Sequence, residues 1–167
     1  MHTRGGTPHR FGTAAWAKPP RIRNLTGPNL HLLGEREPAV YGRDRLSDIE
    51  KACARRAKSL GLAIDFRQSN HEGELIDWVQ AARKSHAAIV INPAGYSHSS
   101  VSLMDALIAF ERPVIEVHLS NIFRREPFRH HSYVSRVALG VISGLGKQGY
   151  LAALDALAGI LKTEVEA

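Results

Sequence analysis

Apolar positions follow two different rhythms along this chain. Residues 46–60 carry apolar side chains every three or four positions and stop at Gly61, which is typical of an amphipathic helix ended by glycine. Residues 87–92 form an almost unbroken apolar run, which is typical of a strand buried on both faces. The same reasoning predicts strands at residues 22–26, 62–66, 87–92, 113–119 and 137–143, and helices at residues 46–60, 74–85, 101–110 and 148–165.

Strands and helices alternate in this prediction, except that the link between residues 119 and 137 contains no clear long helix. Helical crossovers make successive strands parallel and cover both faces of the sheet. A chain of 167 residues, 44% of them apolar, is long enough for one globular domain. We therefore predict an α/β fold, a flavodoxin-like doubly wound sheet of five parallel strands with helices on both faces.

The net charge of +6 is concentrated near the start of the chain. Residues 1–23 contain five basic residues and no acidic residue, and they show no apolar periodicity. We expect residues 1–20 to be a disordered basic extension and residues 21–167 to form the single domain. The remaining sequence is close to neutral and has no basic stripe interleaved with aromatic residues, so we expect no nucleic-acid partner.

Several other features limit the class of protein. No apolar run approaches the roughly 20 residues that a membrane-spanning helix needs, so we expect no membrane association. The single cysteine, Cys53, cannot form an internal disulfide, which favours the reducing cytoplasm. The neighbouring His130 and His131 have no third partner at metal-ligand spacing, so we predict no metal site. The glycines of residues 144–149 lack the second strand and acid of a dinucleotide site, and we predict a tight turn there.

Polar residues follow each of the first four predicted strands. The segments are Gly-Pro-Asn (27–29), RQSN (67–70), NPAGYSHSS (92–100) and HLSN (118–121). Because the carboxyl ends of parallel strands meet at one edge of a sheet, we expect these segments to form a ligand site there. Their Asn, Ser, His and Gly content favours a polyhydroxylated ligand over an apolar one.

Two pairs of residues are candidates for chemistry at this edge. Arg36 and Tyr41 lie five residues apart in one predicted loop, and a fixed cation favours the ionised form of a tyrosine, which can then act as a base. Glu116 and His118 alternate along one predicted strand, so they face the same side and can pair. Each also has a structural alternative: a tyrosine packed at a loop edge, a solvated arginine or a hydrogen-bonded structural histidine.

Five blocks of the sequence resemble the type II 3-dehydroquinate dehydratases. The blocks are GPNLHLLGEREPAVYG (27–42), QSNHEGELIDWV (68–79), INPAGYSHSSVSLMDAL (91–107), PVIEVHLSNIFRREPFRHHSYVS (113–135) and GVISGLGKQGYLAAL (140–154). The resemblance implies a catalytic domain that dehydrates 3-dehydroquinate to 3-dehydroshikimate, a lyase of the shikimate pathway that works by anti elimination through an enolate. It also implies no metal or nucleotide cofactor and a homo-oligomer based on trimers, typically a dodecamer.

The resemblance implies a role for each site residue. Tyr41 is the base, and Arg36 favours its ionised form. Asn29 stabilises the enolate through an ordered water, and His118, held by Glu116, protonates the departing hydroxyl. The substrate-binding residues implied are Asn92 with the backbone N–H groups of Leu119 and Ser120 for the carboxylate, His98 and Arg129 for the ring hydroxyls, and Asp105 from a neighbouring subunit, while Arg125 matches a further arginine near the lid of the family.

The first predicted strand departs from the pattern of this family. Arg21, Arg23 and Asn24 interrupt its apolar run, and Thr26 replaces an asparagine, so we expect this strand to bury poorly. A non-catalytic module that binds quinate or shikimate is a second interpretation of the chain, although binding alone needs no base. The same reaction in quinate breakdown is another alternative.

Overall fold

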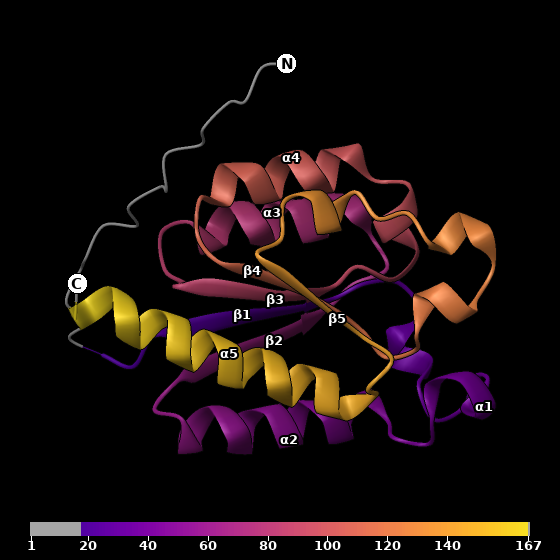
Figure 1. Ribbon diagram of the computed structural model, residues 1–167, viewed down its shortest axis with the longest axis horizontal. Helices are drawn as coiled ribbons and strands as arrows, with labels where there is room; N and C mark the ends of the chain where they lie inside the picture. Colours follow the sequence, from indigo (N-terminus) through magenta and orange to yellow (C-terminus); the bar gives the residue numbers. More distant parts are fainter. Residues whose placement is uncertain (1–17, 167) are drawn as a thin grey trace.

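The computed structural model describes residues 18–166, which form a parallel sheet between two layers of helices (Figure 1). The strands are β1 (Arg21–Thr26), β2 (Ala63–Gln68), β3 (Ala88–Asn92), β4 (Val114–His118) and β5 (Gly140–Ser143). The helices are α1 (Pro38–Tyr41), α2 (Leu46–Ser59), α3 (Glu72–Ala82), α4 (Val101–Phe110) and α5 (Lys147–Glu166). Five short 3₁₀ helices complete these elements: η1 (Leu30–Leu32), η2 (Ala94–His98), η3 (Ile122–Arg124), η4 (Pro127–Arg129) and η5 (Val134–Arg136).

The strand order is β2-β1-β3-β4-β5, and every neighbouring pair is parallel. Helices α2 and α5 cover one face of the sheet, and α3 and α4 cover the other (Figure 1). Because successive side chains of a strand point to opposite faces, β1 contributes Ile22 to the core beneath α2 and α5, and Leu25 to the core beneath α3 and α4. The predicted flavodoxin-like fold is confirmed.

The element boundaries differ from the prediction at several places along the chain. Strand β5 begins at Gly140 instead of residue 137, because the chain first turns through η5. Helix α3 begins two residues earlier than predicted and ends at Ala82, and β2 extends to Gln68. Helix α1 lies inside the segment predicted as a loop, since four residues are too few for a helical period to be recognised.

The glycine-rich segment between β5 and α5 is the tight turn that the sequence predicts. Gly144 and Gly146 have φ values of +89° and +54°, in the left-handed region that favours glycine. A Cβ atom on Gly144 would lie 2.9 Å from the Cβ atom of Asn121. The glycines are therefore required by the turn itself.

The prediction that the first strand buries poorly is wrong. Residues 22–26 of β1 are all buried, and β1 pairs in regular register with both β2 and β3. The charge of Arg23 is accommodated because its Nη1 lies 2.8 Å from Oδ2 of Asp65 on β2. The amide of Asn24 is fully buried and has no hydrogen-bond partner within residues 18–166. Charge pairing between neighbouring strands thus replaces part of the apolar packing of a central strand.

Acid is expected to destabilise the protein through His86. This side chain is only 1% exposed, and its Nε2 lies 3.5 Å from Oδ2 of Asp65. Burial, together with the charges of Arg23 and Arg21, lowers the pKa of His86 to about 4. The unfolded chain therefore binds a proton here near pH 6.5, whereas the folded chain binds it only near pH 4. The stability contributed above pH 6.5 is lost as the pH falls through this window.

We expect the free energy of unfolding to fall by on the order of 2 kcal/mol between pH 6.5 and pH 4 because of this group. Urea unfolding at a series of pH values measures it, and His86→Gln should show a smaller acid dependence than the wild type. His71→Gln, which replaces an exposed histidine, serves as the control and should keep the wild-type dependence. An unchanged dependence in His86→Gln would contradict this assignment.

Cys53 lies in α2 and is fully buried. Burial, with the charge of Glu50, raises the pKa of its thiol to about 12. None of the helices in residues 18–166 combines the length and the hydropathy needed to cross a membrane. The predicted disordered extension falls mainly on residues 1–17, which lie outside the described residues, and it stays a prediction.

Candidate active site

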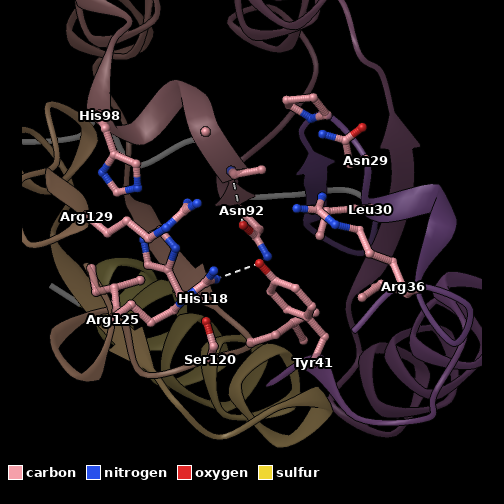
Figure 2. A pocket seen from close by; sticks show the side chains of 16 residues that line it. Asn29, Leu30, Arg36, Tyr41, Asn92, His98, His118, Ser120, Arg125 and Arg129 are labelled. Carbon is pink, nitrogen blue, oxygen red and sulfur yellow. Dashed lines mark hydrogen bonds between the residues drawn. The ribbon is translucent and has the colours of Figure 1, made fainter. Parts of the chain in front are cut away.

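A cavity lies at the carboxyl ends of β1, β3 and β4 (Figure 2). The turn after β1, helices η1 and α1, and the segments that follow β3 and β4 form its wall. Nine of the residues predicted for the site line it: Asn29, Arg36, Tyr41, Asn92, His98, His118, Leu119, Ser120 and Arg129. The topology thus brings together residues that are up to 100 positions apart in the sequence.

The other two predicted residues lie outside the cavity wall. Glu116 is fully buried behind His118 on β4, and Asp105 is exposed on α4. The polar segment after β2 supports the cavity without lining it. Oδ1 of Asn70 accepts a hydrogen bond of 3.0 Å from the backbone N–H of Asn29. Nε2 of Gln68 donates at 3.2 Å to the carbonyl of Gly27, so this segment fixes the turn that carries Asn29.

The turns after β1 and β3 are pressed against each other. The backbone N–H of Gly27 donates to the carbonyl of Asn92 at 2.8 Å. A Cβ atom on Gly27 would lie 2.5 Å from the carbonyl oxygen of Pro93, so only glycine permits this approach. Asn29 follows with φ of +67°, a left-handed conformation that asparagine tolerates. These contacts hold the turn that carries Asn29 against the segment that follows β3.

His118 and Glu116 form a buried pair at the end of β4. The distance between Nε2 of His118 and Oε1 of Glu116 is 2.7 Å. Burial acts to raise the pKa of Glu116, but hydrogen bonds from His118, Ser132 and Ser135 hold it below its ordinary value. Glu116 is therefore ionised and accepts a hydrogen bond from the N–H at Nε2, which leaves Nδ1 of His118 as the ring nitrogen available to a ligand in the cavity.

Tyr41 points into the cavity from the last position of α1, and its hydroxyl meets Arg125 (Figure 2). Nη1 of Arg125 donates to the hydroxyl of Tyr41 at 2.5 Å. The resemblance implies Arg36 in this position, but the guanidinium carbon of Arg36 lies 5.8 Å from the centre of the Tyr41 ring, and its Nε pairs with Glu37 at 3.1 Å. In this structure Arg125 is therefore the cation in direct contact with the tyrosine oxygen.

His98 and Arg129 lie on the opposite side of the cavity from Asn29 and Arg36 (Figure 2). Nδ1 of His98 lies 2.6 Å from the carbonyl oxygen of His131, which can only accept, so Nδ1 carries a proton. Burial lowers the pKa of His98, and the charge of Arg129 adds to this shift. The neutral ring then presents Nε2 as an acceptor, which suits a hydroxyl of a ligand.

The charge of the cavity wall is positive. Arg36, Arg125 and Arg129 line it, and none of its lining residues carries a carboxylate. Arginine clusters of this kind favour an anionic ligand, such as a carboxylate. Within residues 18–166, no group of three His, Cys, Asp or Glu side chains is placed to hold a metal ion.

Sequence reasoning missed Ser132 and Ser135, which contact Glu116, and it named Arg125 without predicting its contact with Tyr41. The contact between Arg125 and Tyr41 spans 84 positions, and no spacing rule connects such residues. Ser132 precedes η5 and Ser135 lies in this short 3₁₀ helix, where no apolar periodicity marks them. All three fall within block 113–135 of the resemblance, which is the only signal in the sequence that could have pointed to them.

Comparisons with known proteins agree with this geometry. The family model described as "Dehydroquinase class II" matches residues 20–158. The chain is 58% identical over 143 residues to 3-dehydroquinate dehydratase 2 of Pseudomonas putida, covering 86% of this chain and 96% of that protein. It is 56% identical over 140 residues to 3-dehydroquinate dehydratase of Streptomyces coelicolor, covering 83% of this chain and 89% of that protein.

Solved structures give the same result. The type II dehydroquinase of Propionibacterium acnes superposes with a TM-score of 0.82 at 42% identity, covering 85% of this chain and 98% of that one. With a family model over most of its length and relatives above 50% identity, the chain belongs to the class II dehydroquinase family.

Proposed function

We propose that this chain dehydrates 3-dehydroquinate to 3-dehydroshikimate, with Tyr41 as the base and His118 as the acid. The observation that carries this proposal is the arrangement of two prepared groups around one cavity: Tyr41 hydrogen-bonded to Arg125, and His118 hydrogen-bonded to the buried Glu116. The curated relatives named 3-dehydroquinate dehydratase support the reaction. A module that only binds its ligand needs neither pair.

The reaction begins at the carbon beside the ring ketone. Tyr41, ionised, removes a proton from this carbon, and the positive charge of Arg125 balances the phenolate before the transfer. The ketone becomes an enolate, which Asn29 stabilises through a water molecule. The enolate then expels the hydroxyl group, and His118 supplies its proton from Nδ1.

The substrate carboxylate binds at the polar end of β4 in this proposal. Asn92 and the backbone N–H groups of Leu119 and Ser120 donate to it, and the arginines of the wall favour its charge. His98 and Arg129 bind the ring hydroxyls from the other side. Arg36 lies beside the Tyr41 ring and adds positive charge there, whereas Arg125 makes the direct contact.

The direct test of the reaction is an ultraviolet absorbance assay of the purified protein with 3-dehydroquinate. Dehydration conjugates the new double bond with a carbonyl group, so turnover appears as a rise in absorbance. We expect this rise. If the protein is folded and binds the substrate without any rise, the non-catalytic binding module is the correct interpretation. The reaction is a step of the shikimate pathway, and quinate breakdown is the alternative use of the same step.

We further propose that the active form is an oligomer based on trimers, typically a dodecamer, in which Asp105 reaches the site of a neighbouring subunit. Asp105 is exposed on α4, and the exposed apolar residues Val101 and Ile108 lie on the same stripe of this helix. An exposed apolar stripe around a carboxylate fits a surface that another subunit covers.

We also propose that the protein works in the cytoplasm. The free, buried thiol of Cys53 fits this reducing compartment.

Mixing two inactive variants tests this arrangement. Asp105→Asn and Tyr41→Phe should each lose most activity, but when refolded together about a quarter of the sites should pair an intact Tyr41 with an intact neighbouring Asp105. Sedimentation should give a mass that is a multiple of three chains. Activity that does not return on mixing, or a monomeric active protein, would exclude a role for Asp105 across subunits.

A further inference from the structure

We propose that Ser132 and Ser135 are positioning residues for the acid of this reaction: their hydroxyls hold Glu116, which in turn holds the His118 ring. This inference rests on the proposed function, because it assigns a purpose to the network behind His118. It concerns residues that do not line the cavity and do not touch the substrate.

The two serines occupy both oxygens of the Glu116 carboxylate. The hydroxyl of Ser132 donates to Oε1 at 2.7 Å, the same oxygen that lies 2.7 Å from Nε2 of His118. The hydroxyl of Ser135 donates to Oε2. The backbone N–H of Ser135 donates at 3.2 Å to the hydroxyl oxygen of Ser132, so the single proton of that hydroxyl is left for Glu116. The carboxylate is thus held at three points and can adopt one orientation only.

The segment that carries these serines is itself tied to the other histidine of the cavity. The carbonyl of His131 accepts from Nδ1 of His98 at 2.6 Å. The backbone N–H of Tyr133 donates to the carbonyl of Ser97 at 2.8 Å. Residues 131–135 therefore contact both His98 and, through Glu116, His118 from behind the cavity. One short segment thus contacts the supports of both imidazoles and fixes them relative to each other.

The serines are needed because Glu116 is fully buried. A buried carboxylate without hydrogen bonds takes up a proton far more readily than one in water. Burial acts to raise the pKa of Glu116, and the bonds from His118, Ser132 and Ser135 overcome this effect. If a serine hydroxyl is removed, Glu116 should bind a proton at higher pH. A protonated Glu116 no longer serves as a fixed acceptor for Nε2 of His118.

Few charged groups compete with this effect. His118 faces Glu116 from the same strand, and the charge of Glu116 also reaches His98 on η2. Arg129, from η4, acts on His98. A change in the pH profile on removal of a serine therefore reports mainly on Glu116 and its two histidine neighbours.

The test compares Ser132→Ala, Ser135→Ala and Ser135→Thr with the wild type in the absorbance assay. We expect kcat to fall about tenfold in each alanine variant, with KM changed by less than about threefold, because the substrate contacts remain. The acidic limb of the kcat profile should move to higher pH. Ser135→Thr keeps the hydroxyl and should recover most of the rate. Ser135 is only half-buried, which gives the added methyl group room.

Ser97→Ala is the matched control. Ser97 is buried, as Ser132 is, but its hydroxyl has no hydrogen-bond partner within residues 18–166, so its loss should leave the pH profile unchanged. Folding of every variant is checked by circular dichroism. A normal kcat in folded alanine variants, or a loss of kcat with an unshifted acidic limb, would overturn the role of the serines. A wild type that binds the substrate without turnover would instead overturn the proposed function.

Discussion

Tyr41→Phe is expected to lower kcat for 3-dehydroquinate by about a thousandfold, since general base catalysis contributes roughly 10² to 10⁴. Phenylalanine keeps the ring between Arg36 and Arg125 but removes the oxygen that Arg125 contacts at 2.5 Å. The first step then has no base. The absorbance assay measures the loss, and binding of the product 3-dehydroshikimate by calorimetry should be nearly unchanged.

A second readout shows which step is lost. In heavy water, an active base exchanges the proton beside the ketone for deuterium, and proton NMR follows this exchange in the substrate. Tyr41→Phe should abolish the exchange together with the dehydration. If the variant keeps more than about a tenth of the wild-type rate, another group must act as the base, since this remainder exceeds what the loss of a base allows.

His118→Asn is expected to lower kcat by a similar factor, about a thousandfold, but through the second step, the loss of the hydroxyl group. Asparagine is shorter and can still donate an amide N–H toward Glu116, so the buried carboxylate is not left without a partner. It has no proton to supply to the departing hydroxyl. Dehydration should therefore nearly stop while the enolate still forms.

The exchange experiment separates the two variants. His118→Asn should continue to exchange the proton beside the ketone in heavy water without releasing product, because Tyr41 and Arg125 are intact. Loss of both exchange and dehydration in a folded His118→Asn variant would mean that His118 also takes part in the first step. Matching Kd values for the product in the two variants would show that neither substitution prevents binding in the cavity.

The sequence predicted the order of the elements and the sheet edge that carries the site. Periodicity is sufficient for this, because β3 is an uninterrupted apolar run and α2 has a regular apolar stripe. It failed for α1 and for the start of β5, where four or fewer residues determine the local structure. It also failed for β1, because burial of Arg23 depends on Asp65, a residue on another strand.

The site was predicted less completely than the fold. Residues at strand ends could be placed from topology alone, and Glu116 and His118 could be paired because they alternate on one strand. The contact of Arg125 with Tyr41 depends on how the end of η3 approaches α1, and local spacing carries no information about that. The same holds for Ser132 and Ser135, which reach Glu116 across 16 and 19 positions.

The cluster of buried Arg23, half-buried Asp65 and buried His86 has a consequence for protein engineering. It lies toward the amino ends of the strands, away from the cavity at their carboxyl ends. Well-packed apolar side chains often stabilise a protein when they replace a whole buried ion pair. Libraries of substitutions at this cluster therefore allow selection for stability to heat and acid while the residues of the active site stay unchanged. Stability and catalytic rate can therefore evolve separately in this fold, because they depend on residues at opposite ends of the sheet.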